Sequence, residues 1–245
     1  MVRKSRKSRA EWKIYKNVFD SFTEKNLFLL SSQGHFAELD QPIALGKEAN
    51  VFLARKKDDT HIIVKIYRLE NCNFNKMFYY ISADPRFLGL ENQKRKIIFS
   101  WVQREFRNLL LAREKIPVPT PIAFKDNILL MEFIGDDVPA PKLKDHIPEN
   151  PEKFFKKVIK QIKLLIDANL IHGDLSEFNI LNYKNDPVFI DMSQSTPLKT
   201  QNSRELLERD LFNVCKFFNK HMKVDVEAVK KDVLKHFDSK DPDKL

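Results

Sequence analysis

Cysteine, glycine and long apolar runs are all scarce in this chain of 245 residues. Its two cysteines, Cys72 and Cys215, show no metal-ligand spacing and suggest no disulfide framework, which indicates a reducing compartment. The sequence has no apolar run near the ~18 residues that a membrane span requires. Its basic start lacks the apolar core of a secretory signal. We therefore expect a soluble, cytoplasmic protein without a membrane partner.

The most informative segment is residues 171–179, which contains Asp174 and Asn179 in one short loop. A second acid, Asp191, ends the apolar run 188–190. A lone Asp and Asn in a polar loop are usually turn residues, but the apolar segments on either side favour a loop followed by two short strands. The spacing matches the kinase pattern H-x-D-L-x-x-x-N with a metal-binding aspartate after it. It predicts an ATP-dependent phosphotransferase with Mg²⁺ or Mn²⁺ on Asn179 and Asp191.

The other parts of a kinase site are expected upstream, and two charged residues fit them. Lys65 lies in the apolar run 62–67, where an unused charge would be costly. Glu105 lies in a helical pattern at residues 94–114 and is a suitable acidic partner. A lysine whose long stem snorkels from an edge strand is the alternative for Lys65 alone. With the downstream residues present, we predict that Lys65 and Glu105 pair near the phosphates of ATP.

Glycine scarcity bears on the phosphate loop, because the chain has no G-x-G-x-x-G. The single glycine at this position is Gly46, within residues 43–52. A turn with Gly46 and the small Ala49 can still direct backbone N–H groups at an anion. By itself this turn is weak evidence for a phosphate-binding loop. Its position one strand before Lys65 strengthens that interpretation.

The net charge of +9 is concentrated in residues 3–9 and in a predicted helix at 151–169. The lysines of that helix lie opposite its apolar face, so a solvated helix face is the ordinary interpretation. The basic run 3–9 is more suggestive of nucleic acid, since an unstructured basic arm can neutralise phosphates. It has no interleaved aromatic residues, so we expect non-specific RNA contact and no DNA specificity.

The remaining pattern predicts a mixed α and β chain without internal repeats. The expected elements are helices at 11–19, 23–31, 94–114, 151–169 and from about 203, strands at 36–39, 51–55, 62–67 and 128–134, and a long irregular stretch at 69–92.

Taken together, these segments resemble the RIO-family atypical protein kinases, and within them the Rio1 branch. The resemblance covers about residues 11–237. The motifs that carry it are residues 46–52, 104–109, 116–122, 131–135, 139–141, 174–179 and 190–195.

The resemblance implies an α+β, trimmed two-lobed protein-kinase-like fold, with a small N-lobe sheet plus helix, a mainly helical C-lobe and no long activation segment. The expected divisions are a disordered basic arm at 1–10, a helical extension at 11–40, an N-lobe at 41–134 and a C-lobe at 135–245.

The resemblance also implies the site residues. The expected catalytic set is Lys65, Glu105, Asp174, Asn179 and Asp191, with the metal on Asn179 and Asp191. The expected ATP-binding set is Gly46, Lys47, Glu48, Ala49, Val51, Lys65, Met131, Glu132, Ile134, Leu181 and Ile190.

Three further features bear on the site. Leu45 stands where the family usually has a small hydroxyl residue, and Ile63 stands where it usually has alanine over the adenine. Asp210, inside the predicted helix from 203, is either a buried acid that braces the catalytic loop or an exposed helix-surface partner.

The expected function is RIO-type serine/threonine kinase or ATPase activity with a role in maturation of the small ribosomal subunit and its RNA. Asp191 could itself accept the phosphoryl group, with Asp174 then activating water, and ordinary kinase chemistry is the alternative. A small-molecule kinase of the aminoglycoside or choline kinase type shares the loop, but only 54 residues follow Asp191. A catalytically silent pre-ribosomal RNA-binding module is the third possibility, and the complete catalytic set argues against it.

Overall fold

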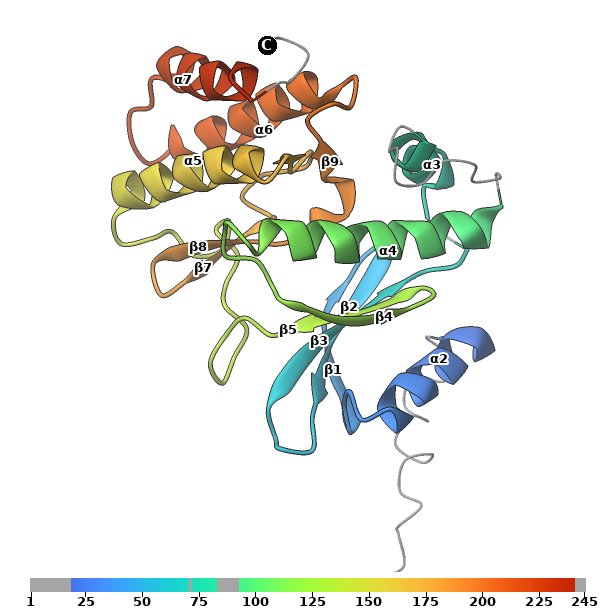
Figure 1. Ribbon diagram of the computed structural model, residues 1–245. Helices are drawn as coiled ribbons and strands as arrows, with labels where there is room; N and C mark the ends of the chain where they lie inside the picture. The colour runs from blue at the N-terminus through green and yellow to red at the C-terminus, as the bar shows by residue number, and fades with distance from the viewer. Residues whose placement is uncertain (1–18, 71, 83–92, 241–245) are drawn as a thin grey trace, which may run out of the picture. The chain divides into compact units, whose positions relative to one another are not determined.

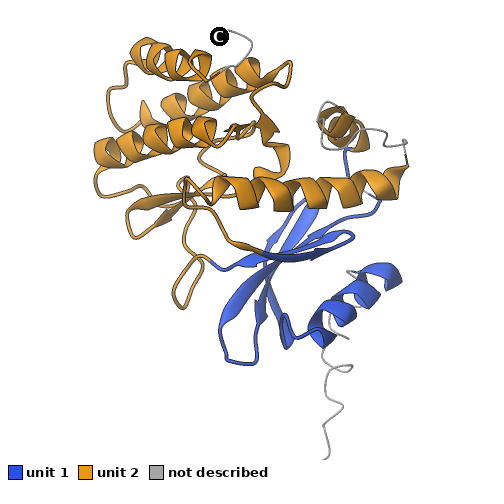
Figure 2. Ribbon diagram, viewed as in Figure 1, with its two compact units in different colours: residues 1–73, 122–133 blue, residues 74–121, 134–245 orange. Residues whose placement is uncertain are grey.

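The computed structural model describes residues 19–70, 72–82 and 93–240, and the chain divides into two compact units (Figure 2). The first unit comprises the described residues up to Asn73 together with residues 122–133. The second comprises the described residues of 74–121 and of 134–245. The predicted helix at 11–19 and the basic arm fall almost wholly outside the described residues.

An antiparallel sheet forms the centre of the first unit (Figure 1), with strand order β1-β2-β3-β5-β4. Its strands are β1 (Glu38–Leu45), β2 (Ala49–Arg55), β3 (His61–Tyr67), β4 (Pro121–Lys125) and β5 (Ile128–Glu132). The predicted strands at 51–55, 62–67 and 128–134 are confirmed as β2, β3 and β5, with small differences at their ends.

The prediction of a strand at 36–39 was wrong in its extent, because β1 runs on to Leu45. This strand passes through Pro42. Proline is tolerated here because β1 is an edge strand whose register shifts on both sides of Pro42. The edge position removes the need for an N–H donor at that residue.

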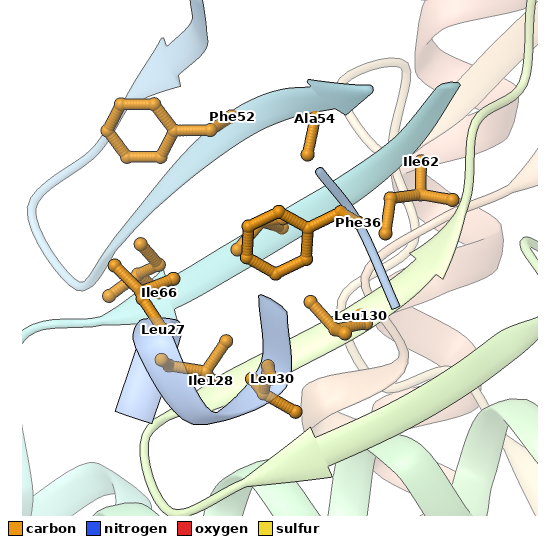
Figure 3. Close-up of a cluster of buried hydrophobic side chains, with 10 residues drawn as sticks. Leu27, Leu30, Phe36, Phe52, Ala54, Ile62, Ile66, Ile128 and Leu130 are labelled. Atoms are coloured by element: carbon orange, nitrogen blue, oxygen red, sulfur yellow. The ribbon is translucent and has the colours of Figure 1, made fainter. Parts of the chain in front are cut away.

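Helix α2 (Ser21–Ser32) packs on one face of this sheet. The Asp20 carboxylate caps it by accepting the N–H groups of Phe22 and Thr23. Because side chains alternate along a strand, one face collects the even-numbered residues of β2, β3 and β5. The resulting core, drawn in Figure 3, consists of Leu27, Leu30, Phe36, Phe52, Ala54, Ile62, Val64, Ile66, Ile128 and Leu130.

The second unit is mainly helical (Figure 1). Its helices are α3 (Phe74–Ser82), α4 (Lys94–Ala112), α5 (Pro151–Asp167), α6 (Ser203–Phe218) and α7 (Val226–Asp238). Short strands pair as β6 (Leu170–Ile171) with β9 (Thr196–Pro197) and as β7 (Ile180–Tyr183) with β8 (Asp186–Phe189), and a 3₁₀ turn, η3, spans Met192–Gln194.

The prediction that residues 69–92 are irregular was wrong for Phe74–Ser82, which form α3. Met77, Tyr80 and Ile81 are its buried residues, at the i, i+3, i+4 spacing of a helix face. The helix packs against α4, with the Tyr80 and Trp101 rings 6.0 Å apart. Contact with α4 thus stabilises a segment too short to be stable alone.

The lysines of α5 have the ordinary role of a solvated helix face. Lys156 pairs with Glu152, Lys157 with Asp186, and Lys163 with Asp232. Phe154, Phe155, Val158, Ile162, Leu165 and Ile166 are buried on the opposite face.

Candidate active site

The β7–β8 hairpin brings Asn179 and Asp191 to the same end of one structure. Ile180 pairs with Phe189, and the N–H of Ile190 donates to the carbonyl oxygen of Asn179 at 3.0 Å. Asn179 therefore lies just before the first strand of the hairpin, next to the point where Ile190 and Asp191 follow the second strand. A turn at Lys184 and Asn185 closes this hairpin, and both residues have the positive φ values of such turns.

Asp191 adopts a left-handed backbone conformation, with φ 62° and ψ 66°. Non-glycine residues seldom adopt this conformation, which costs about 1–3 kcal/mol and is concentrated at functional sites. The hydroxyl of Ser193 donates to Asp191 Oδ1 at 2.7 Å. The chain thus uses strained backbone and a hydrogen bond to orient this carboxylate.

The amide of Asn179 is oriented by the residue that precedes it in the kinase pattern. Its Nδ2 donates to the carbonyl oxygen of Asp174 at 2.8 Å, so its amide oxygen is turned away from that carbonyl. A carboxylate and an amide oxygen are the hard donors that Mg²⁺ prefers, and Mg²⁺ usually takes few protein ligands. Among the described residues no group of three or more His, Cys, Asp and Glu side chains could hold a metal. The chemistry of the Asn179 and Asp191 oxygens fits a metal that substrate phosphates also ligate.

His172 connects the loop of Asp174 to the strand that leads into Asp191. Its Nδ1 accepts the N–H of Asp174 at 3.3 Å, and its Nε2 lies 3.1 Å from the carbonyl oxygen of Ile190. Burial lowers the pKa of His172 to about 4, although the Ile190 carbonyl and the charge of Asp191 act to raise it. A neutral imidazole can accept at one nitrogen and donate at the other, as this bridge requires.

Asp210 of α6 is a buried brace of the catalytic loop, which settles the choice left open by the sequence. It is 1% exposed, and its two carboxylate oxygens accept the N–H groups of Gly173 and Leu175 at 2.8 Å each. The neighbouring Arg209 donates to the carbonyl oxygen of Gly173. A side chain at Gly173 would meet the carbonyl oxygen of Gln194 at 2.8 Å, so this loop needs glycine there.

Helix α4 holds the segment that follows Asp191. The Nδ2 of Asn108 donates to the carbonyl oxygens of Met192 at 2.9 Å and Ser195 at 2.8 Å. Arg104 donates to the carbonyl oxygen of Ser193 at 3.3 Å. Glu105 is 1% exposed on the same helix. The helix that carries the predicted partner of Lys65 is thus hydrogen-bonded to the predicted metal loop.

In the first unit, three of the predicted ATP residues, Val51, Lys65 and Met131, share one face of the sheet, whereas Glu132 alternates to the other face. Val51 is paired with Lys65, and Ile63 with Met131, all on the face opposite α2. Lys65 is 7% exposed, and its Nζ lies 5.1 Å from the centroid of the Tyr67 ring. Lys65 belongs to the first unit and Glu105 to the second, and their pairing stays a prediction.

Gly46 lies in the tight turn between β1 and β2. Its N–H donates to the carbonyl oxygen of Ala49 at 3.0 Å, and an added Cβ would lie 2.8 Å from that oxygen. The turn therefore requires glycine for close approach, without a positive φ. Glu48 and Ala49 are partly buried in this hairpin and Lys47 is exposed.

The other predicted ATP residues are placed by element. Met131 and Glu132 end β5, Leu181 lies in β7 and Ile190 follows β8, while Ile134 precedes the described linker that crosses residues 135–150. The bridge between Lys142 and Leu181 holds that linker to the β7 strand.

Asn108 and Gln194 lie in the motifs at 104–109 and 190–195, but sequence reasoning assigned neither of them a role in the site. Gln194 donates from Nε2 to Asp174 Oδ2 at 2.9 Å, a contact between residues twenty positions apart. Asn108 and Gln194 both act on loops that are distant in sequence, and no local pattern marks such contacts.

Comparison with known proteins identifies the family to which this chain is similar. Residues 50–231 match the model of the RIO domain. The chain is 40% identical to the RIO-type serine/threonine-protein kinase Rio1 of Methanocaldococcus jannaschii over all of this chain and 84% of that protein. Identity to the Rio1 of Haloferax volcanii is 38%, over 86% of this chain and 73% of that one. Identity to human RIO1 is 35%, over 88% of this chain and 39% of the longer human protein.

A solved structure supports the fold. The Rio2 kinase of Chaetomium thermophilum, in a complex with ADP, Mg²⁺ and phosphoaspartate, has a TM-score of 0.64 with 19% identity over 89% of this chain and 74% of that one. The α+β kinase-like fold expected from the sequence is confirmed. Among the described residues, no helix has the length and apolar character needed to cross a membrane.

Proposed function

Because the chain belongs to the RIO kinase family, in its Rio1 branch, we propose that it transfers the γ-phosphoryl group of ATP with the residues described above. The observation that carries this proposal is the meeting of Asp174, Asn179 and Asp191 at the end of one hairpin. Phosphoryl transfer requires positioning and electrostatic stabilisation more than covalent chemistry. The hydrogen bonds to this loop supply the positioning.

The proposed roles follow from residue chemistry. Lys65 binds the α- and β-phosphates and pairs with Glu105, while the turn around Gly46 directs N–H groups at the phosphates. Val51, Met131 and Ile190 would contribute apolar contacts to the base. The bulky Ile63 shares the face of Lys65 and Met131, so we expect it to narrow the space for the adenine.

Asn179 and Asp191 would hold Mg²⁺ or Mn²⁺, which neutralises charge on the phosphates when bound. The strained conformation of Asp191 and its bond from Ser193 fit a carboxylate that is held ready before the ion arrives.

We further propose that Asp191 can accept the phosphoryl group. One carboxylate oxygen would form a bond to phosphorus as the bond between phosphorus and the ADP oxygen breaks, which gives an acyl phosphate and ADP. Water would then attack the phosphorus as the bond between phosphorus and the Asp191 oxygen breaks, its proton would pass to Asp174, and inorganic phosphate would leave with the carboxylate of Asp191 restored. The complex of the Chaetomium Rio2 kinase with phosphoaspartate supports this possibility.

Ordinary transfer to a serine or threonine hydroxyl is the competing reaction, and the names of the relatives favour it. The two are separated by incubating the protein with γ-labelled ATP and Mg²⁺. An acyl phosphate on Asp191 is removed by hydroxylamine and accumulates in Asp174→Ala. Label found solely on serine or threonine would overturn the acyl-phosphate step.

The proposed macromolecular partner is a precursor of the small ribosomal subunit with its RNA. The support for this partner is the family resemblance and the net charge of +9. Three lysines of α5 are already ion-paired, which directs attention to the basic run at residues 3–9.

A further inference from the structure

Gln194, in the turn η3, is a buried side chain that contacts the carboxylate of the proposed base. It is 7% exposed, and its Nε2 donates to Asp174 Oδ2 at 2.9 Å. It lies three residues after Asp191, on a turn held to α4 by Asn108. The proposed metal loop and the proposed base are thus joined by one amide side chain.

The orientation of this amide follows from its neighbour. An amide oxygen turned toward Oδ2 would place two acceptors together, whereas the N–H group makes a hydrogen bond with the carboxylate. In this orientation Gln194 Oε1 is buried and has no hydrogen-bond partner within the described part of the chain. Burying an amide oxygen without a partner costs free energy, which an apolar side chain of similar size would avoid.

Asp174 is fixed at its backbone by other bonds. Its N–H donates to His172 and its carbonyl oxygen accepts from Asn179. Those bonds leave the torsion angles of the side chain to be set by contacts at the carboxylate. A donor on Oδ2 restricts rotation of that group and thereby aims its oxygens.

We propose that Gln194 is a positioning residue, which holds the Asp174 carboxylate in the orientation that receives the proton of the nucleophile. When the oxygen of a hydroxyl group or of water bonds to phosphorus, the O–H proton passes to Asp174, and the bond that breaks is the one to the ADP oxygen in direct transfer or to the Asp191 oxygen in hydrolysis of the acyl phosphate. Gln194 neither gives nor takes a proton, and its amide keeps one hydrogen bond throughout. The inference rests on the proposed function, because it assigns Asp174 the role of base.

The test is Gln194→Met, which keeps the volume and removes the donor. Gln161 of α5 gives a matched control: it is 8% exposed, and its Nε2 donates at 2.9 Å to the carbonyl oxygen of Pro187. Its Oε1 is likewise without a partner among the residues described. Gln161→Met therefore removes an equivalent buried amide and its one hydrogen bond, and it leaves the contacts of Asp174 unchanged.

For Gln194→Met we expect kcat to fall about 10- to 100-fold, as misplacement of a catalytic group does. The KM for ATP should stay within about twofold, and the Tm should be unchanged or higher, because a partnerless oxygen is removed. Gln161→Met should keep kcat within about twofold. The isosteric Gln194→Glu, which replaces the donor by an acceptor, should lose kcat at least as strongly as Gln194→Met and serves if the methionine variant folds poorly.

The inference is overturned if Gln194→Met and Gln194→Glu both keep wild-type kcat. It is also overturned if Gln161→Met loses kcat equally, because the loss then comes from general loosening of the interior. A wild-type protein that turns over no ATP would overturn the proposed function, and this inference with it. Loss of kcat in the Gln194 variants alone, at unchanged KM and Tm, supports it.

Discussion

Asp210 holds the backbone on both sides of Asp174, because its two carboxylate oxygens accept the N–H groups of Gly173 and Leu175 at 2.8 Å each. Neither oxygen contacts the side chain of Asp174 in these bonds. Burial raises the pKa of Asp210 to about 7, while the two N–H groups and the charge of Arg209 lower it and the charge of Asp174 raises it further. The position of the base is thus coupled to a buried acid on α6.

Asp210→Asn should lower the free energy of unfolding by about 1–3 kcal/mol, because an asparagine amide has one acceptor oxygen and leaves one buried N–H group unpaired. The folded pKa of Asp210 lies above its ordinary value of 3.8, so the folded state binds more protons than the unfolded state between about pH 4 and pH 7. This extra stability is complete below that window and is lost as the pH rises through it. The difference between wild type and Asp210→Asn should therefore shrink from pH 4 to pH 7 in urea unfolding. A difference that grows with pH would contradict it.

Asp191→Asn should abolish metal-dependent ATP turnover while the protein stays folded. Asparagine tolerates the left-handed backbone of position 191, and its amide oxygen can still accept from Ser193. Only the negative charge is lost. The test is to measure turnover as a function of Mg²⁺ concentration and to check the folding of the variant by circular dichroism. Asp191→Ala should be equally inactive, and undiminished turnover in both variants would refute the metal assignment.

Lys65→Met should lower kcat/KM by on the order of 10²-fold or more, because the cation on the phosphates is removed. The apolar stem of lysine is retained, and the face that it shares with Val51 remains filled. Because Glu105, the proposed partner of Lys65, is 1% exposed and would lose its cation, Lys65→Met should also lower the Tm, so turnover is compared at a temperature at which both proteins are folded. Steady-state ATP turnover and thermal unfolding are the measurements. Activity within a factor of two of wild type would make Lys65 a structural lysine.

Deleting residues 3–9 should flatten the salt dependence of RNA binding and leave ATP turnover unchanged. Each neutralised phosphate contributes roughly 0.7–0.9 to the slope of log K against log salt concentration. The slope measured with a single-stranded RNA oligonucleotide should decrease by several times that amount. The same slope in full-length and shortened protein would leave this run as a solubilising tail.

Strong local patterns made much of this structure predictable from the sequence. Strand β3 carries its lysine in a β-branched run, and the β7–β8 hairpin is marked by apolar pairs around a turn. These elements were predicted because their periodicity and turn residues lie within a few positions of one another. The extent of the edge strand β1 was mispredicted because it depends on register shifts against β2. Helix α3 was missed because its formation depends on packing against α4.

The contacts that orient the site were less accessible to sequence reasoning. The kinase spacing identified Asp174, Asn179 and Asp191. It did not identify the side chains that hydrogen-bond to these residues and to the loops around them. The bond from Gln194 to Asp174 joins residues twenty apart, and those from Asn108 reach loops more than eighty residues away. Such pairs follow from how α4 and η3 pack, which no short window of sequence contains.

Asn108 itself provides a prediction about the metal. Its Nδ2 holds the carbonyl oxygens of Met192 and Ser195, on the turn that follows Asp191, and the side chain is fully buried. Asn108→Ala removes both bonds and frees the turn that places the Asp191 carboxylate. We expect the Mg²⁺ concentration for half-maximal turnover to rise about 10-fold or more, as loss of a group that orients a metal ligand does.

Asn127 supplies the control for that experiment, because it is an equally buried asparagine in the first unit. Its Nδ2 also makes two bonds, at 2.9 Å to Thr23 Oγ1 and 2.9 Å to the carbonyl oxygen of Tyr67. Asn108→Ala and Asn127→Ala should lower the Tm by similar amounts, since each leaves two buried acceptors with fewer donors. Only Asn108→Ala should change the Mg²⁺ requirement. If the two variants shift it equally, the change reflects lost stability, and α4 has no separate role in placing Asp191.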